Sequence, residues 1–469
     1  MSVTRRAFQL GGLSASGLLA LGGRLPVHAG PDRTLTAKPG AAQLLEANEP
    51  ATRIWGYQGG VPGPLLEAVQ GRPFAVDLTN GLEQPTTAHW HGIRIDNAMD
   101  GVAYLTQEPV IPAKTFAYRF TPPDAGTYWY HPHNRTWEQM ARGLYGMLIV
   151  REPKPPAFDR DIPLILDDWR LGRDGQIDTR SFGALHDKAH AGRLGNVVTL
   201  NGKPTDDIAV RAGERIRLRL LNAANARVMA VRFDGHGPII IALDGQPVAP
   251  FAPDGDVVLL APAQRADVML DLAADVGTKA KITVLTQREA LHIGNLVYDA
   301  RRRRRAKPLS DQFALPANPM PSDLDLKNAI TTDLVMSGGA MGAMASARYQ
   351  GQEYGLRELA RTHGKVWAFN GEAGMTDAPL AKYPRGATVK VRMVNDTAWP
   401  HAMHFHGHHV REVAHAKRAP LPHWRDTVLM LPREEITVAF VAHNPGKWMC
   451  HCHMLEHQAG GMATWYEVS

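Results

Sequence analysis

Gly71-Arg-Pro-Phe-Ala-Val-Asp-Leu-Thr-Asn80 is one of three stretches in the chain that share a single design. The other two are Gly213-Glu-Arg-Ile-Arg-Leu-Arg-Leu-Leu-Asn222 and Gly386-Ala-Thr-Val-Lys-Val-Arg-Met-Val-Asn395. In each stretch Gly precedes Asn by nine positions, and apolar residues alternate with polar ones between them. This is the pattern of a half-buried strand with a turn at both ends. The repetition predicts three homologous β-domains, for which a β-sandwich repeated three times is the simplest architecture.

The length and composition agree with an all-β protein of several domains. The chain has 469 residues, which suggests about three domains at roughly 150 residues each. Its 44 Gly and 34 Pro residues favour tight turns over long helices. With 52 Lys+Arg against 46 Asp+Glu the net charge is only +6, so nucleic acid is not an expected partner. The two cysteines, Cys450 and Cys452, are too close together to build a disulfide framework.

Two changes in composition mark the predicted domain boundaries. One lies near Pro153 to Pro156. The other is a run of arginines from Arg301 to Arg305, followed by a Pro/Ser/Ala-rich stretch to about Ser322, which is typical of a solvated linker. We therefore expect domains at 30–153, 154–300 and 323–469, with a linker at 301–322.

The first 29 residues resemble an export signal. Arg5 and Arg6 precede a weakly apolar run from Gly11 to Gly23, and Val27-His28-Ala29 offers small residues suited to a signal peptidase. The run is too short and too rich in glycine to span about 30 Å of hydrocarbon. We expect a cleaved twin-arginine signal over 1–29, export by the twin-arginine machinery, a periplasmic or secreted mature chain, and no stable membrane anchor.

Four His-x-His pairs occur at matching offsets in the first and third repeats. The pairs are His89/His91, His131/His133, His404/His406 and His451/His453. The second repeat has Val231 and Phe233 at the first of these offsets, so the middle domain is expected to hold no ligands. Residues i and i+2 of a strand project to the same face, so each pair presents two imidazoles side by side. Imidazole suits Cu, Zn, Fe and Ni, so these eight residues predict a metal cluster without naming the metal.

The third repeat carries a second set of ligands. His401, Cys452 and His457 give a His₂Cys set, and Met462 follows as a candidate axial thioether, which is the constellation of a blue-copper electron-transfer site. Successive residues of a strand point to opposite faces, so Cys452 faces this site while His451 and His453 face the cluster. One short backbone segment therefore joins the two sites, over about 10 Å, and gives electrons a covalent path.

These motifs resemble the copper-binding motifs of the multicopper oxidases, in the three-domain, laccase-like bacterial branch that includes copper-efflux oxidases. The matching segments are His89-Trp-His-Gly92, His131-Pro-His133, His401-Ala-Met-His-Phe-His-Gly-His408 and His451-Cys-His-Met-Leu-Glu-His457 through Met462. The resemblance implies three tandem cupredoxin-like Greek-key β-sandwich domains and four coppers per chain. It implies type 1 copper at His401, Cys452, His457 and Met462, type 2 at His89 and His404, and a type 3 pair at His91, His131, His133, His406, His451 and His453.

The implied reaction is four one-electron oxidations of a substrate at type 1 copper, coupled to reduction of O₂ to water at the trinuclear cluster. Asp100, nine residues beyond His91, matches an acidic residue that resembles a proton relay in bacterial members; a solvated loop carboxylate is the alternative reading. The chain departs from the copper-efflux branch at Gln458, where that branch has a glutamate. The role of Glu456 stays open.

The resemblance leaves the substrate open. It implies that imidazole edges of His401 and His457 lie near the surface, where phenols or aromatic amines would deliver electrons, with Cu(I) as the alternative substrate. Met336, Met341 and Met344 lie in a Gly/Ala/Ser-rich stretch that we expect to be flexible, and which either binds Cu(I) or carries incidental methionines. A non-catalytic scaffold or copper-storage protein is disfavoured because no ligand of the family pattern is missing.

Overall fold

The computed structural model of the chain describes residues 27–28, 33–286, 289–306, 309, 311 and 313–469. The expected signal segment, 1–29, lies outside these residues except for the two-residue strand β1 (Val27–His28). Among the described residues, no helix is both long enough and apolar enough to cross a membrane.

The strands form three successive pairs of sheets along the chain. In the first pair, one sheet has the order β1, β4 (Leu65–Val69), β9 (Gly146–Arg151), β8 (Gly126–His131), β6 (His89–His91). The other sheet has the order β3 (Thr52–Tyr57), β2 (Thr34–Ala42), β5 (Phe74–Asn80), β7 (Thr115–Phe120). In the second pair, one sheet has the order β11 (Val197–Leu200), β10 (Arg160–Trp169), β13 (Arg215–Asn222), β18 (Arg265–Asp271), β15 (Ile239–Leu243), β16 (Gln246–Phe251). Its partner sheet has the order β12 (Asp206–Val210), β20 (Ala290–Tyr298), β19 (Lys279–Leu285), β14 (Met229–Phe233), β17 (Val257–Leu260).

The third pair carries the end of the chain. One sheet has the order β24 (Trp367–Phe369), β21 (Ile330–Gly338), β26 (Thr388–Asn395), β31 (Glu435–Val441), β28 (Val410–His415), β29 (Trp424–Arg425). The other has the order β25 (Ala381–Tyr383), β33 (Ala463–Val468), β32 (Gly446–Cys452), β27 (His401–Phe405), β30 (Thr427–Met430). A hairpin, β22 (Ser346–Tyr349) and β23 (Gln352–Gly355), precedes the longest α-helix of the described residues. The α-helices are α1 (Thr136–Gln139), α2 (Leu185–Ala189), α3 (Leu356–His363) and α4 (Leu455–Ala459).

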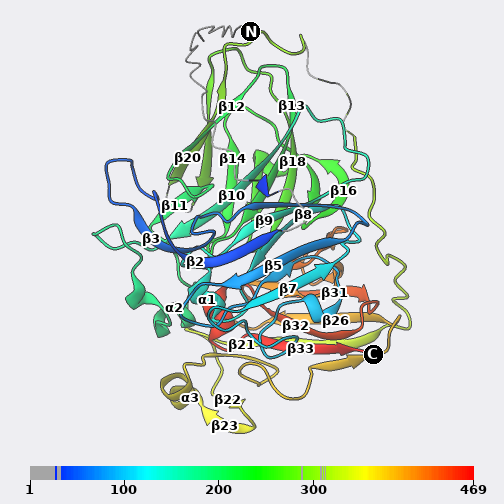
Figure 1. Ribbon diagram of the computed structural model, residues 1–469. Coiled ribbons are helices and arrows are strands. Elements are labelled where there is room, and N and C mark those ends of the chain that lie inside the picture. Colours follow the sequence, from blue (N-terminus) through cyan, green and yellow to red (C-terminus); the bar gives the residue numbers. More distant parts are fainter. Residues whose placement is uncertain (1–26, 29–32, 287–288, 307–308, 310, 312) are drawn as a thin grey trace, which may run out of the picture.

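The predicted all-β fold class is confirmed. Each sheet pair encloses its own large cluster of buried apolar side chains, as expected of a sandwich. Figure 1 shows the first pair, in blue and cyan, lying against the third pair, in orange and red, with the green second pair at the top of the view; the second pair also contacts the third, through Arg265 and Asp426. This arrangement brings the two histidine-bearing sheet pairs together although they are distant in sequence.

The three repeats fold as predicted, and the asparagine that ends each of them makes the same contacts. Strands β5, β13 and β26 end at Asn80, Asn222 and Asn395. In each case the side-chain oxygen accepts a hydrogen bond from the backbone amide two residues later. The side-chain amide donates to the carbonyl of a residue 30, 38 or 36 positions along the chain. The repeated Asn is therefore a turn residue that ties its strand to a second segment of the same sandwich.

The expectation that Met336 to Met344 forms one flexible loop is wrong at its first residue. Met336 lies in β21, fully buried in the core of the third sheet pair. Met344 packs on a smaller apolar cluster, whereas Met341 is 73% exposed. The apolar positions of β21 are followed at once by Gly338 and Gly339, so the glycine-rich composition conceals the end of a core strand.

The arginine-rich linker makes more contacts than a solvated segment would. Arg304 and Arg305 both donate to the carboxylate of Asp159, whose side chain is only 6% exposed. Asp159 also accepts from the backbone amide of Arg215. Further on, Leu315 is buried against the second sheet pair. The linker therefore contacts the second sheet pair at Arg304 and Arg305 and again at Leu315.

Replacing Asp159 with Asn should weaken this tie. Burial alone raises the pKa of Asp159, but hydrogen bonds from Arg305, the amide of Arg215 and Arg304 lower it to about 2. Because this lies below the unfolded value of about 4, the carboxylate stabilises the fold above that value and the stabilisation is lost as the pH falls toward 2. We expect Asp159→Asn to lower the thermal unfolding midpoint at neutral pH by the equivalent of about 1–3 kcal/mol. The difference from wild type should shrink on acidification.

The matched control is Asp275→Asn, because Asp275 pairs with Arg303 of the same linker but is 95% exposed. It should change the midpoint little. Equal effects of the two substitutions would contradict the role given to Asp159.

Candidate metal centres

The eight histidines of the four His-x-His pairs meet at the contact between the first and third sheet pairs. Two pairs come from β6 and the end of β8, which are antiparallel neighbours with His89 opposite His131. The other two come from β27 and β32, again antiparallel, with His404 opposite His451. All eight rings are nearly or fully buried, at 0 to 6% exposure. The structure therefore brings together every histidine that the sequence predicted for the cluster.

Hydrogen bonds on the outer nitrogens fix the tautomers of six of these rings. In four rings Nδ1 donates to a backbone carbonyl: His89, His131, His404 and His451. In the other two the acceptor is a carboxylate. Nδ1 of His406 donates to Asp100, and Nε2 of His91 donates to Asp426. A neutral imidazole that donates from one nitrogen carries its lone pair on the other. Each of these six rings therefore keeps a lone pair on its inner nitrogen, as metal-binding histidines do.

The inner nitrogens form three groups that lack protein donors. Within the part of the chain that the structure describes, Nε2 has no hydrogen-bond partner in His89 and His404, and the same is true in His133, His406 and His451. In the third group, Nε2 of His131 lies 3.4 Å from Nδ1 of His91 and 3.4 Å from Nε2 of His453. Three nitrogens arranged in a plane at about 2.0 Å from one metal ion would be about 3.5 Å apart. The spacing therefore matches three imidazoles around one ion.

The electrostatics also favour neutral, metal-ready rings. Burial lowers the pKa of His131, His133, His406, His451 and His453 well below the ordinary value, and repulsion from neighbouring histidines lowers it further. A protonated ring could not bind a cation through the protonated nitrogen. The cluster is thus a set of buried electron-pair donors with no proton between them.

Two carboxylates hold the outer edge of the cluster. Asp100 contacts Nδ1 of His406 at 3.0 Å through its carboxylate, and its backbone carbonyl accepts from Nδ1 of His89 at 2.7 Å. On the opposite side Asp426 contacts His91 at 3.1 Å, and its carbonyl accepts from His404. The loop carboxylate singled out in the sequence is therefore buried and in contact with two of the predicted ligands.

Asp426 was missed by the sequence analysis, together with its partner Arg265. Both side chains are fully buried, and the guanidinium contacts both oxygens of the carboxylate. Thr427 also contacts His91, His404 and Asp426 through its hydroxyl group. No repeated motif marks these residues, because Arg265 comes from the middle sheet pair. Only the contact between Arg265, at the start of β18, and Asp426, the residue before β30, reveals them.

The second predicted site is equally well assembled. Nδ1 of His401 and Nδ1 of His457 lie 3.0 Å apart, and Sγ of Cys452 lies 3.6 Å from the first and 3.8 Å from the second. Met462 is fully buried, and its carbonyl accepts from the amide of Cys452. Burial raises the pKa of Cys452 to about 12, so a metal ion must displace the thiol proton to bind. These donors are those of a blue-copper site.

The expected surface-facing edges of His401 and His457 are not exposed. Both side chains are fully buried. Nε2 of His457 donates to the carbonyl of His190 at 2.6 Å, and Nε2 of His401 contacts the hydroxyl of Thr397 at 3.0 Å. His457 is thus covered by His190, the residue that follows α2 in the second sheet pair, where the sequence predicts no ligands.

Glu456, whose role the sequence left open, faces the same segment. Its carboxylate accepts from the backbone amide of Arg193 and from the side-chain amide of Asn225, both at 3.0 Å. Burial raises the pKa of Glu456. Glu456 therefore connects α4 to the second sheet pair by hydrogen bonds and stabilises the segment that covers His457.

Comparison with known proteins agrees with this geometry. Family models described as "Multicopper oxidase" match residues 40–155, 160–280 and 353–469. The chain is 30% identical to "Multicopper oxidase MmcO" of Mycobacterium tuberculosis, over 93% of this chain and 87% of that protein. It is 28% identical to "Laccase-1" of Fomitopsis schrenkii, over 87% of this chain and 81% of that protein.

Solved structures give the same result. The crystal structure of a multi-copper oxidase from Pseudomonas thermotolerans is 30% identical, with a TM-score of 0.80 over 95% of this chain and 100% of that one. Lac15 from a marine microbial metagenome is 37% identical, with a TM-score of 0.74 over 93% of this chain and 100% of that one. The three sheet pairs are thus cupredoxin-like, and the chain belongs to the multicopper oxidases, copper-dependent oxidoreductases that use O₂ as electron acceptor and hold four coppers.

Proposed function

We propose that this oxidase is laccase-like and takes electrons from phenols or aromatic amines. The single observation that carries the proposal is the pair of buried donor sets, one His₂Cys and one of eight histidines, joined through Cys452. When bound, the coppers supply one-electron oxidation of the reductant at the first set and four-electron reduction of O₂ to two waters at the second.

The proposed ligand roles follow the donor atoms. His401, Cys452, His457 and Met462 hold type 1 copper, and His89 and His404, with their two unpartnered Nε2 atoms, hold type 2. The type 3 ions are held by two triplets: His91, His131 and His453, and His133, His406 and His451. The backbone of Cys452 continues directly into His451 and His453, so the chain itself supplies the electron path between the two sets.

His190 is the residue through which we expect electrons to enter. Its carbonyl accepts from Nε2 of His457, and its ring stacks on that of His186 with centroids 4.1 Å apart. The side chain of His186 is 78% exposed. A reductant that docks on the two stacked rings contacts His190, and the carbonyl of His190 is hydrogen-bonded directly to His457.

Asp100 is proposed as the group that delivers protons. Its carboxylate is buried and in contact with His406 and His89, beside the place where oxygen is reduced. A carboxylate held there can pass protons one at a time without a charged group being brought in from solvent. Gln458 cannot relay protons in this way, since a side-chain amide does not release a proton near neutral pH.

The domain and location proposals rest on the sequence. The sheet pairs support domains at 30–153, 154–300 and 323–469 with a linker at 301–322, except that β1, which pairs with β4 of the first sheet pair, lies within the expected signal. The twin-arginine pair and the small residues at 27–29 support a cleaved signal, export by the twin-arginine machinery, and a mature protein in the periplasm or outside the cell.

Oxygen uptake by the copper-loaded protein tests the substrate. A methoxyphenol and a chelated Cu(I) donor are offered separately, with no added Cu(II). We expect the phenol to be oxidised at least as fast as Cu(I). Rapid Cu(I) oxidation with phenol turnover that appears only after Cu(II) is added would identify a cuprous oxidase instead.

Replacing Cys452 with Ser should remove the intense blue absorption and all turnover, because a hydroxyl cannot replace the thiolate at type 1 copper. Visible absorption and oxygen uptake give the result, and circular dichroism checks the fold. Cys450→Ser is the matched control: Cys450 is also buried and on the same strand, two residues away. It should keep the blue band. A blue, active Cys452→Ser protein would overturn the assignment.

Replacing Asp100 with Asn should lower kcat by about 10²- to 10⁴-fold, the usual contribution of a positioned acid. Copper content should be unchanged, since the backbone carbonyl that orients His89 remains. The exposed neighbour Asp96 provides the control substitution Asp96→Asn. We would measure kcat against pH and copper per chain. Loss of copper in parallel with activity would indicate a purely structural role.

A further inference from the structure

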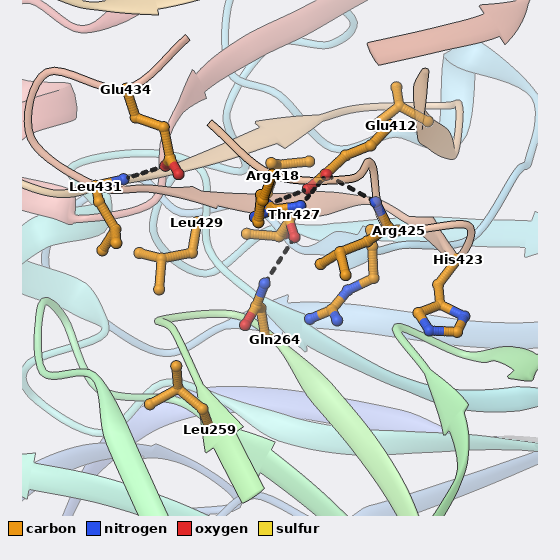
Figure 2. A pocket seen from close by; sticks show the side chains of 13 residues that line it. Leu259, Gln264, Glu412, Arg418, His423, Arg425, Thr427, Leu429, Leu431 and Glu434 are labelled. Atoms are coloured by element: carbon orange, nitrogen blue, oxygen red, sulfur yellow. Dashed lines mark hydrogen bonds and ion pairs between the residues drawn. The ribbon is translucent and has the colours of Figure 1, made fainter. Parts of the chain in front are cut away.

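A cavity lies between the second and third sheet pairs. None of the predicted copper ligands lines it, but Thr427, whose hydroxyl contacts His91 and His404, does. Its volume is about 270 Å³, just below the roughly 300–1,000 Å³ of pockets that hold drug-sized ligands, so it suits a smaller molecule. Leu259 of β17 and Gln264 line it from the second sheet pair, and residues 410–434 line it from the third. Figure 2 shows Leu259 facing Leu429 across the cavity, with Gln264, Arg425 and His423 in a row between the two sides.

The walls are apolar and the rim is unusually rich in exposed leucine. Leu259 and Leu431 are each 54% exposed, and Leu421 is 47% exposed. Large apolar side chains that gather around a hollow mark a binding surface more often than isolated ones do. These leucines would bury apolar surface only if a ligand filled the cavity.

Most polar groups at the cavity are already satisfied by the protein. Arg418 makes two hydrogen bonds to Glu412, which also accepts from the amide of Leu421. Glu434 accepts from the amide of Leu431 and contacts Nε2 of His415. Gln264 donates to the carbonyl of Thr427 and accepts from the amide of Ala261.

Arg425 is different. Its Nε donates to Asp244 at 2.7 Å, but neither Nη1 nor Nη2 makes a hydrogen bond within the described part of the chain. The side chain is 19% exposed, and neither terminal nitrogen is among the fully buried unpaired atoms of the described residues, so both donors are open to a ligand or to water. A guanidinium with two free amino groups in one plane is suited to a carboxylate, which accepts two parallel hydrogen bonds.

A flat wall lies next to this guanidinium. The ring of His423 lines the cavity and stacks on Phe251 with an interplanar angle of 4° and a centroid distance of 5.2 Å. Burial and then the charge of Arg425 lower the pKa of His423, which keeps the ring neutral. A planar apolar group would pack between this face and the leucines.

We propose that this cavity binds a small aromatic carboxylate, with the carboxylate on Nη1 and Nη2 of Arg425 and the ring among Leu259, Leu421 and His423. The site is separate from the proposed electron-entry surface at His186 and His190. The proposal therefore does not depend on which reductant the enzyme oxidises.

Isothermal titration of the copper-loaded protein with benzoate tests it. Benzoate has no phenolic hydroxyl and is used here as a ligand, not a reductant. We expect saturable binding at one site per chain. Benzamide, which has the same ring without the charge, and acetate, which has the charge without the ring, should each bind at least about tenfold more weakly.

Two substitutions locate the site. Arg425→Gln removes the guanidinium that would bind the carboxylate, while Asp244 keeps a hydrogen bond from the amide of Arg265. Leu259→Glu places a negative charge on the exposed rim with little effect on folding. Each should weaken benzoate binding at least about tenfold. Val276→Glu is the control, since Val276 is an exposed apolar residue of the same sheet pair that does not line the cavity.

The proposal is overturned by any of three results. These are absence of saturable benzoate binding to the wild-type protein, equal binding of benzamide, and unchanged benzoate affinity in both Arg425→Gln and Leu259→Glu. Weakened binding in Val276→Glu to the same extent as in Leu259→Glu would show a general charge effect and would also count against the site.

Discussion

Eight buried imidazoles lie beside one another at the contact between two sandwiches, with their inner nitrogens turned toward one another. Burial lowers the pKa of seven of them, His91, His131, His133, His404, His406, His451 and His453, and acceptors on the outer edge determine which nitrogen carries the proton in six of the eight rings. Without a cation the inner lone pairs face each other at a cost in free energy. The sandwiches on both sides must therefore be rigid enough to hold an arrangement that only the metal relieves.

The middle sheet pair supplies none of the predicted ligands, yet it contacts both predicted sites. Arg265 reaches across to Asp426 and so orients His91 and His404 from behind. At the other site, His190 covers His457. The contribution of this sheet pair is to position groups and to exclude water, which strengthens electrostatic interactions inside both sites.

The sequence predicted the strands and the ligands because both depend on local periodicity. The spacing of His89 and His91 reports directly which face of β6 they occupy. It could not predict Asp426, Arg265 or His190, whose importance comes from contacts between segments more than 150 residues apart. Composition was misleading for Met336, a core residue of β21 next to a glycine-rich turn. It also concealed the contacts that Arg304 and Arg305 make with Asp159.

The distribution of the histidines along the chain also constrains the order of assembly. His91 and Asp426, which touch in the folded protein, are separated by 335 positions. Half of the cluster leaves the ribosome early and the other half only with the final segment, so no partial chain holds a complete site. The cluster can therefore bind its full set of coppers only after the whole chain has been made and its first and third sheet pairs have folded against each other.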